Sequence, residues 1–189
     1  MTVSRFEKLN DVWFGVVLDD DQRVVSCGFS VEGKEDVSKQ VLRVIPKSLK
    51  ASESNNNGFA SSVLRSLSLI YQGKDPEVVS RLAFENLPPF VRKALMVTVE
   101  IPRGFVSTYG AVAAAAGSPR AARAVGSAEA RNPFAPVVPC HRVVSSTLGL
   151  GGYGGGLTVK KAFLAREGVF FEGKKVSARC LWVPRKDSS

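Results

Sequence analysis

Apolar and polar positions along residues 1–90 follow the periods of short strands and helices. The stretch VWFGVVLDDDQRVVSCGFS (residues 12–30) reads as two strands around an acidic turn, which predicts a β-hairpin. The helical spacing of Val37, Val41 and Val44 predicts a weak helix in EDVSKQVLRVI. A polar loop at 51–58 is expected before FASSVLRSLSLIYQG, whose apolar period predicts a helix that ends at Gly73. These elements describe a small α/β unit that carries no recognisable chemistry.

Two adjacent prolines separate this unit from a second set of elements. The segment NLPPF (86–90) is the best candidate for a linker, because consecutive prolines resist both helix and sheet. The next stretch predicts a helix that ends near residues 102–104. VSTYGAVAAAAG predicts a further helix, with Ser107 or Thr108 as its N-cap and Gly117 as its terminator.

A third helix follows in SPRAARAVGSAEARN, with Ser118 as the expected N-cap and Pro119 at the first helical position. With the preceding helix it forms a candidate helix-turn-helix. Its long polar residues are Arg120, Arg123 and Arg131, and the others are mostly small. So smooth a helix can approach DNA closely but reads few base edges, which predicts binding through phosphates and groove shape, nearly independent of sequence. The pattern alone equally fits an Ala-rich helix packed in a core.

A glycine-rich stretch, LGLGGYGGGLTVKK, contains the spacing G-x-G-x-x-G that is typical of dinucleotide sites. Only 35 residues follow Gly154, which is too few for the βαβαβ half that such a site requires. We therefore interpret the run as a loop whose bare backbone lets a ligand come close. TVKKAFLAREG is then expected to be a helix that ends at Gly168.

Positive charge is concentrated in the second half of the chain. Residues 1–90 carry a net charge of −1 and residues 91–189 a net charge of +10, which together give the +9 of the whole chain. This asymmetry indicates that the second half faces a polyanion, although a basic surface without a specific partner would look the same. No apolar run is long enough to span a membrane, and the N-terminus lacks the layout of a secretory signal, so we expect a soluble intracellular protein.

The chain has three cysteines and one histidine, without a CxxC pair, so a metal site is not expected. Cys27 lies in an apolar run and is most simply a small buried residue. A disulfide between Cys27 and Cys180 is a minor alternative, because such bonds are rare in the cytosol.

The stretch PVVPCHRVV places Cys140 directly against the only histidine, His141. A thiol attacks as its thiolate, so His141 could accept the proton directly if Pro139 bends the backbone, or through a water molecule. Neighbours in an extended segment point to opposite faces. Of the five acids in the second half, Glu167 could fold back to orient the imidazole. On the dipeptide alone, an inert buried thiol is the simpler interpretation.

Three stretches taken together resemble the O6-alkylguanine-DNA alkyltransferases, also called methylated-DNA–protein-cysteine methyltransferases. They are VPCHRVV, the upstream YGAVAAAAGSPRAARAVGSAEARNPFAP and the downstream GGYGGGLTVKKAFLAREG. The resemblance covers about residues 86–170 and is specific, because the motifs occur in order and at family-like spacing. Residues 1–85 match only in general layout.

The resemblance implies a fold and a domain organisation. Residues 1–85 would form an α/β domain of ribonuclease H-like type, followed by a linker at 86–91. Residues 92–175 would form a mostly α-helical domain for DNA binding and alkyl transfer, with a winged-helix-like helix-turn-helix. The last segment, VFFEGKKVSARCLWVPRKDSS, has no clear counterpart in the family and would be an extra strand or a basic tail, with the C-terminal tail at 176–189. Some family members bind zinc through N-terminal histidine and cysteine, and this chain lacks those ligands.

The resemblance also implies a role for individual residues. Cys140 would accept the alkyl group from O6 of guanine, with His141 as the base acting through water and Glu167 as the orienting carboxylate. Tyr109 would donate to the guanine ring as the leaving oxygen gains charge, and Asn132 would join the helix-turn-helix to the active-site segment. Pocket residues would be Val143, Tyr153 and Gly154. DNA would be bound by Arg123, which replaces the extruded nucleotide in the stack, and by Arg120, Ser118, Ala124, Gly126 and Arg131.

The expected reaction uses no cofactor and no metal, and its partner is double-stranded DNA carrying O6-alkylguanine or O4-alkylthymine. Flipping the nucleotide out of the duplex costs a few kcal/mol, which an inserted arginine can partly offset. No second nucleophile is evident to remove the alkyl group from the thioether, so the protein should act once. We also expect it to be a monomer and to lie in the cytoplasm (nucleoid) or nucleus.

Two other functions fit parts of the sequence. An alkyltransferase-like protein binds damaged DNA without transfer, but such proteins lack the cysteine that this chain has at position 140. A cysteine hydrolase would need an oxyanion site and a distant histidine, and it would not explain a basic helix-turn-helix.

Overall fold

The computed structural model describes residues 2–43, 45, 51–54, 57–74 and 81–184. The chain divides into two compact units. Unit 1 comprises Met1–Asn86 with Pro133–Val137, and unit 2 comprises Leu87–Asn132 with Val138–Ser189. The segment Pro133–Val137 joins unit 1 because its backbone pairs with Cys27, whose amide donates to the Pro133 carbonyl at 2.8 Å.

Unit 1 is built on a four-stranded sheet with the strand order β3-β2-β1-β4. Its strands are β1 (Thr2–Leu9), β2 (Val12–Leu18), β3 (Val24–Ser30) and β4 (Ala51–Glu53). The first three are antiparallel, and the predicted hairpin is confirmed with Phe14 opposite Phe29. The loop prediction for 51–58 is wrong at its start, because residues 51–53 pair in parallel with β1. β1 itself was not anticipated.

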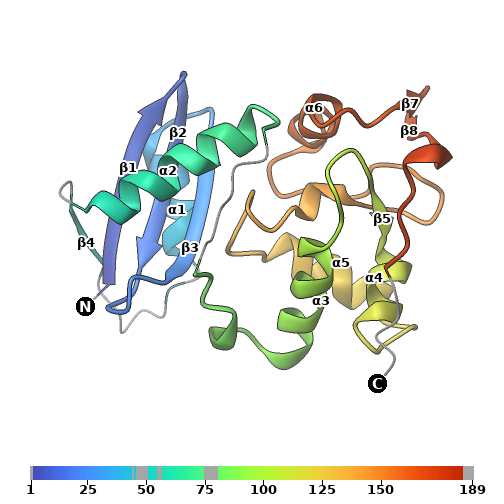
Figure 1. Cartoon of the computed structure of the whole chain (residues 1–189), viewed down its shortest axis with the longest axis horizontal. Helices are drawn as coiled ribbons and strands as arrows, with labels where there is room; N and C mark the ends of the chain where they lie inside the picture. The colour runs from blue at the N-terminus through green and yellow to red at the C-terminus, as the bar shows by residue number, and fades with distance from the viewer. Residues whose placement is uncertain (1, 44, 46–50, 55–56, 75–80, 185–189) are drawn as a thin grey trace. The chain divides into compact units, whose positions relative to one another are not determined.

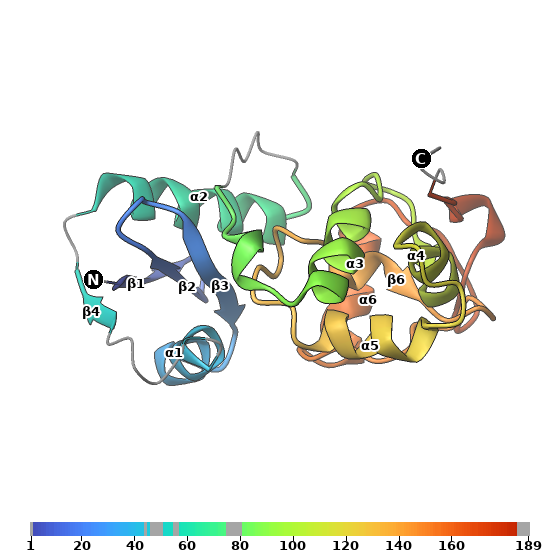
Figure 2. The same cartoon turned by 90° about the horizontal axis from the view of Figure 1, so that it is seen from below.

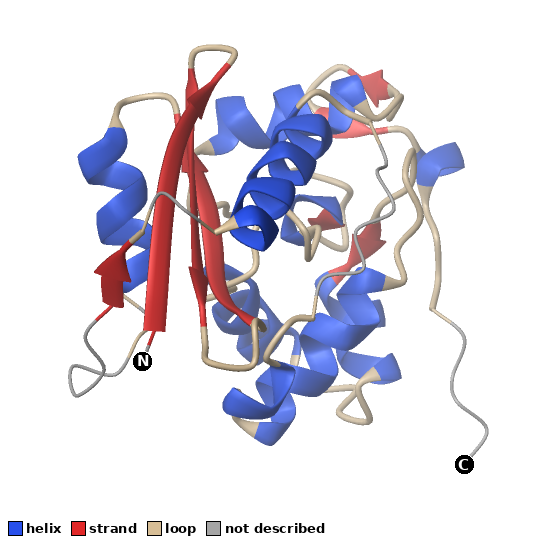
Figure 3. Ribbon diagram, turned by 60° about the vertical axis from the view of Figure 1, so that its left-hand side comes forward, coloured by secondary structure: helices blue, strands red, loops and turns tan. Residues whose placement is uncertain are grey.

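The two helices of unit 1, α1 (Lys34–Leu42) and α2 (Gly58–Tyr71), cover opposite faces of this sheet (Figures 1, 2 and 3). Strand β2 is therefore buried on both faces: Val17 packs with α1, and the Phe14 ring packs edge-on against Tyr71 of α2. A Cβ at Gly15 would lie 2.9 Å from the Phe6 ring, so this position in β2 has no room for a side chain.

Both helix predictions for unit 1 are confirmed in their positions. Val37 and Val41 are fully buried under the sheet, while Val44 lies outside the described residues. The Asn57 side chain caps α2 by accepting from the amide of Ala60 at 2.9 Å, which satisfies one of the free donors at the helix start. The chain leaves α2 through Gly73, whose φ of +78° is in the left-handed region.

Unit 2 is mainly helical and contains two short two-stranded sheets (Figure 1). Its helices are α3 (Pro89–Val99), α4 (Tyr109–Ala115), α5 (Ala122–Ala130) and α6 (Leu157–Arg166). β5 (Ser107–Thr108) runs parallel to β6 (Val143–Val144), and β7 (Phe171–Glu172) pairs with β8 (Lys175–Val176). A core cluster joins α3, α4, α5 and β6 through Ala94, Val112, Val125 and Val143. The α4–α5 pair thus rests on α3, and β6 follows the cysteine segment directly.

The boundary between the two units falls between Asn86 and Leu87, inside the NLPPF segment, and the two prolines of this segment begin the next helix. Pro89 is the first residue of α3 and Pro88 is its N-cap, which is favourable because the first helical amides have no partner within the helix. Helix α3 ends at Val99, before the expected stop near 102–104. The prediction that Thr108 caps α4 is confirmed, since its hydroxyl accepts from the amide of Ala111 at 3.1 Å.

The predicted start of the next helix at Ser118 and Pro119 is wrong. Helix α5 begins at Ala122, with Ala121 at the N-cap. The Ser118 amide instead donates back to the Ala113 carbonyl at 2.8 Å, and its carbonyl accepts from the Ala121 amide at 2.9 Å. The residues 118–120 therefore belong to the turn that closes α4, and α5 starts only after them.

The segment after α6 packs against unit 2 as far as the structure describes it. The β7–β8 hairpin is followed by the 3₁₀ turn η3 (Ala178–Cys180). Val176 and Cys180 are buried in a core cluster with Leu164 of α6. The thiols of Cys27 and Cys180 are both free, so the minor disulfide alternative is not realised. Among the described helices, none is long and apolar enough to cross a membrane.

Candidate active site

Cys140 and His141 lie in a 3₁₀ turn, η2 (Cys140–Arg142), rather than in an extended segment. The turn closes when the Arg142 amide donates to the Pro139 carbonyl at 2.8 Å. Its curvature removes the alternation of faces that an extended chain would impose. Cys140 is 6% exposed, and His141 is fully buried with its ring stacked on Phe163 at a centroid distance of 4.7 Å.

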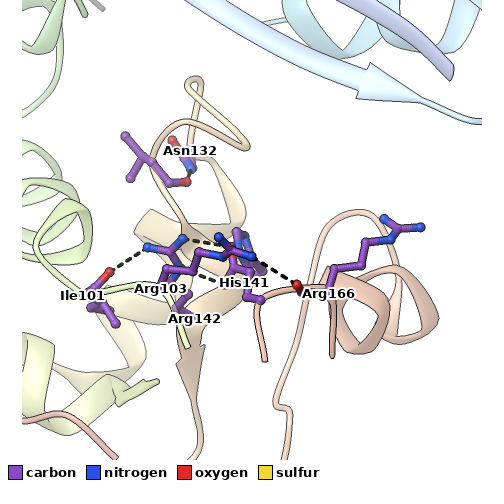
Figure 4. A network of polar contacts seen from close by, with 8 residues as sticks. Ile101, Arg103, Asn132, His141, Arg142 and Arg166 are labelled. Atoms are coloured by element: carbon purple, nitrogen blue, oxygen red, sulfur yellow. Dashed lines mark hydrogen bonds and ion pairs between the residues drawn. The ribbon is translucent and has the colours of Figure 1, made fainter. Parts of the chain in front are cut away.

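A network of hydrogen bonds holds the His141 ring in place (Figure 4). Its Nε2 lies 2.9 Å from Oε1 of Glu167, the C-cap residue of α6. The Arg142 guanidinium donates to both carboxylate oxygens, from Nε at 2.9 Å and from Nη2 at 2.8 Å. Its Nη1 donates to the Ile101 carbonyl at 2.7 Å. Arg142 therefore holds Glu167, and Glu167 holds the imidazole.

The charges of this network define the tautomer of His141. Burial alone would raise the pKa of Glu167, but hydrogen bonds from His141 and Arg142 outweigh it and lower the pKa to about 2. Burial lowers the pKa of His141, so the ring is neutral at pH 7. Because an ionised carboxylate can only accept, Nε2 carries the proton and Nδ1 carries the lone pair. Nδ1 is buried and has no hydrogen-bond partner among the described residues.

The thiol of Cys140 is held in its protonated form. Burial, and then the nearby Glu129 carboxyl, raise the pKa of Cys140 to about 12. A hydrogen bond with the Asn132 side chain and the charge of Lys160 act in the opposite direction. The Asn132 amide nitrogen also donates to the Val138 carbonyl at 2.9 Å, which links the end of α5 to the cysteine segment. A base is therefore required before this sulfur can attack.

Cys140 opens into a pocket of about 650 Å³ within unit 2. One face of α5 forms a wall of this pocket, and the glycine-rich segment forms another. The lining residues are Tyr109, Gly110, Ala122, Arg123, Gly126, Glu129, Ala130, Cys140, Ser145, Ser146, Gly152, Tyr153 and Gly154. The pocket is large enough for a nucleobase, and the thiol is its soft nucleophile.

The glycine-rich segment is shaped around Tyr109. The hydroxyl of Tyr109 donates to the Gly152 carbonyl at 3.3 Å. A Cβ at Gly151, whose φ is +68°, would lie 3.0 Å from the Tyr109 ring. Burial, followed by the charges of Glu129 and Cys140, raises the pKa of Tyr109, so its hydroxyl remains a proton donor.

Two buried ionisable residues of the site were not predicted from the sequence. Lys160 of α6 is fully buried, and its Nζ donates to the carbonyls of Val143 at 2.6 Å and Gly152 at 3.3 Å. Glu129 of α5 is 7% exposed and accepts from the Thr98 hydroxyl at 2.7 Å. Neither stood out, because a lysine in TVKK and a glutamate in SAEAR look like solvent-facing helix residues. Only the apolar neighbours of Glu129 on the same helix face hinted at burial.

All the predicted site residues belong to unit 2. Of the residues predicted to line the pocket, one does not. Cys140, Tyr109, Tyr153 and Gly154 line it. Val143 does not line it: its side chain is fully buried in the core, and only its carbonyl takes part, by accepting from Lys160. Ser145 and Ser146, farther along the same segment, line the pocket in its place.

The predicted DNA-binding residues lie on α5 and the turn before it. Arg120, Arg123, Ala124 and Arg131 are exposed, and Ser118 is half-buried in the turn. Neither Arg120 nor Arg123 forms an ion pair within the described part of the chain, whereas Arg131 bonds back to the Ser127 carbonyl at 3.1 Å. Gly126 faces the pocket instead of the outer surface. Arg123 is both exposed and at the pocket rim.

The pattern of residues 89–169 matches the family model described as the DNA-binding domain of 6-O-methylguanine DNA methyltransferase. A methylated-DNA–protein-cysteine methyltransferase of Methanothermobacter thermautotrophicus is 47% identical over 51% of this chain and 53% of its own length. The protein of the same name from Thermococcus gammatolerans is 34% identical over 84% of this chain and 90% of its own.

A solved structure agrees with these relatives. The crystal structure of Mycobacterium tuberculosis OGT in complex with DNA superposes with a TM-score of 0.68 at 25% identity, covering 87% of this chain and 92% of that one. Similarity at this level extends over both units. From its buried cysteine site, its sequence relatives and its fold, the chain belongs to the methylated-DNA–protein-cysteine methyltransferase family.

Proposed function

We propose that this protein repairs DNA by moving the alkyl group of O6-alkylguanine in a duplex onto Sγ of its own Cys140. The observation that carries this proposal is the position of Cys140: a thiol on the wall of a nucleobase-sized pocket, one residue from a neutral histidine that is fixed by Glu167. The family membership supports DNA repair by alkyl transfer.

His141 is the base in this proposal. Its Nδ1 carries the lone pair, because Glu167 accepts from Nε2, and a water molecule can relay the proton from the thiol to Nδ1. When His141 takes the proton, the ionised Glu167 stabilises the imidazolium that forms. Arg142 is a positioning residue, since it contacts Glu167 and not the substrate.

The transfer itself is a displacement at a saturated carbon. The Sγ–carbon bond forms while the carbon–O6 bond breaks, and the electron pair of the broken bond passes to the guanine. His141 then passes the proton taken from the thiol to the guanine, so that a thioether and an ordinary guanine are the products. Tyr109 stabilises the charge that develops on the guanine by donating from its hydroxyl, which its raised pKa keeps protonated. O4-alkylthymine would react in the same way.

The damaged nucleotide must leave the DNA double helix before it can enter the pocket. The α4–α5 pair would act as the helix-turn-helix, with Ser118, Arg120 and Ala124 at the phosphates and Arg123 filling the vacated place in the stack. Exposure of Arg123 at the pocket rim supports this role. The β7–β8 hairpin after these helices supports a winged-helix-like assignment, and the order β3-β2-β1-β4 supports a ribonuclease H-like one for unit 1.

The buried thioether would make the reaction irreversible. No second thiol or carboxylate nucleophile is among the residues that line the pocket except Glu129, whose oxygen is a poorer nucleophile than sulfur. The protein is therefore proposed to act once. We further propose that it works as a monomer, in the cytoplasm or the nucleus, where the DNA is. Its domain boundaries are proposed near residues 85 and 91.

Mass spectrometry tests the proposal. The intact protein incubated with a duplex carrying O6-methylguanine should gain one methyl group, and peptide mapping should find it on Cys140. Cys140→Ser should gain none while still binding DNA, and Cys180→Ser, which changes a buried thiol outside the pocket, should be methylated like the unaltered protein. A methyl group on any other residue, or none with excess duplex, would sink the proposal.

A further inference from the structure

Glu129 is a buried acid in the wall of the pocket, and the proposed reaction gives it no role. It extends from α5 beside Gly126 and Ala130, on the helix face that lines the pocket with Cys140. Its Oε1 accepts from the Thr98 hydroxyl at 2.7 Å. Its Oε2 is buried and has no partner among the described residues. An unpartnered carboxyl oxygen buried in the wall of a binding pocket places an unneutralised charge beside whatever the pocket holds.

The charge of Glu129 shifts the pKa values of the ionisable groups around Cys140. It raises the pKa values of both Cys140 and Tyr109, after burial itself, and it opposes the effect of burial on Lys160. A carboxylate that disfavours a thiolate at this site must equally disfavour any other anion brought beside Cys140. Water screens this interaction weakly, because Glu129 is 7% exposed and Cys140 is 6% exposed.

We propose that Glu129 is a specificity-determining residue that makes the pocket select alkyl groups by charge, accepting neutral adducts and rejecting anionic ones such as carboxymethyl. The inference rests on the proposed function, because it concerns the alkyl group that Cys140 receives. The alkyl carbon must lie against Sγ when the bond forms, so substituents on that carbon enter the field of Glu129.

Protonation of Glu129 tunes this selection. Burial raises the pKa of Glu129 to about 7, against the smaller opposing effects of the Thr98 hydroxyl and the Lys160 ammonium. The groups that face it are Thr98 of α3, Tyr109 of α4, Cys140 of η2 and Lys160 of α6. Rejection of anions should therefore grow as the pH rises from about 6 to about 7.5, below the pKa of about 8 to which burial lowers Lys160.

The test uses two probes of matched shape in otherwise identical duplexes. O6-carbamoylmethylguanine is the neutral isostere of O6-carboxymethylguanine, so the ratio of their transfer rates reports charge rather than size. Because both reactions use the same thiolate, its ionised fraction cancels in the ratio. The unaltered protein should prefer the neutral probe, and Glu129→Gln, which keeps the shape and can still bond Thr98, should reduce that preference by about tenfold or more.

Two further variants separate charge from structure. Glu100→Gln removes the same charge from an exposed residue at the end of α3, and should leave the ratio unchanged because water screens that position. Thr98→Val removes the hydroxyl that lowers the pKa of Glu129, and should weaken the preference at pH 7. A ratio in Glu129→Gln equal to that of the unaltered protein, with no change between pH 6 and 7.5, would overturn the inference. O6-methylguanine is run in parallel: no methyl transfer would overturn the proposed function, and this inference with it.

Discussion

Nζ of Lys160 lies 2.6 Å from the carbonyl oxygen of Val143, although the lysine is fully buried. This bond ties α6 to β6, the strand that follows the cysteine turn. A second bond to Gly152 ties the same ammonium to the glycine-rich segment. One buried charge thus links α6, β6 and the glycine-rich segment, and it also lowers the pKa of Cys140 against the effect of burial.

Lys160→Met should slow alkyl transfer by about tenfold or more, because the thiolate loses a nearby positive charge. Single-turnover rates on an O6-methylguanine duplex measure the effect. Lys161→Met is the matched control, since the neighbouring lysine is exposed and lies over the Phe171 ring. Equal rates in the two variants, with both folded by circular dichroism, would show that Lys160 has no influence on the sulfur.

Glu167 should make stability depend on pH in the acid range. Its folded pKa of about 2 is below the ordinary value of 4.5, so the carboxylate stabilises the fold above pH 4.5 and this contribution disappears as pH falls toward 2. The loss is on the order of 3 kcal/mol. Denaturant unfolding at pH 5 and at pH 2.5 measures it.

Glu167→Gln should be less stable than the unaltered protein at pH 5, since Arg142 loses its buried partner. It should lose less on acidification, because the amide does not titrate. The neutral His141, whose pKa burial lowers, adds an acid loss of the same sign to both proteins. Parallel stability curves for the two proteins between pH 5 and 2.5 would contradict the assignment.

Arg123→Ala should slow repair of a duplex by about tenfold and leave reaction with free O6-benzylguanine nearly unchanged, because only the duplex requires a nucleotide to be flipped. Lys74→Ala, which removes a positive charge from an exposed position of unit 1, is the control. If the variant lost equal activity on both substrates, Arg123 would act inside the pocket and not in the stack.

Affinity for undamaged DNA should fall steeply with salt and depend little on sequence. The net charge of +10 on residues 91–189 suggests several phosphate contacts, and about six would reduce affinity roughly 10³-fold between 50 and 200 mM salt. Fluorescence anisotropy with unrelated duplexes measures both properties. Arg120→Ala should reduce the slope by about one. A flat salt titration would argue against binding through phosphates.

Local signals in the sequence were sufficient for several elements. The apolar runs on either side of an acidic turn predicted β2 and β3, and Thr108 and Gly117 marked the two ends of α4. These features depend on backbone groups within a few residues, so neighbouring side chains decide them. Strand β4, with the polar sequence ASE, carries no such signal and forms because β1 offers it backbone partners.

The predicted start of α5 was wrong because contacts with the preceding helix outweighed a local signal. Ser118 and Pro119 are a good local start signal, but the backbone of Ser118 is used by the turn that ends α4. The cysteine segment changed in a similar way: the sequence read it as extended, and the fold makes it a 3₁₀ turn.

By itself the sequence determined the family, and through that resemblance it predicted Cys140, His141 and Glu167 as central residues, because the family motifs are contiguous or stand at specific spacings. Tertiary structure decided the surroundings that give these residues their chemistry. In the folded chain Lys160 and Glu129 are buried, and Arg142 pairs with Glu167. Val143, which was predicted to line the pocket, lies in the core. The physical reason is that a charge acquires its pKa from burial and from partners distant in the chain, and neither is visible until the helices are packed.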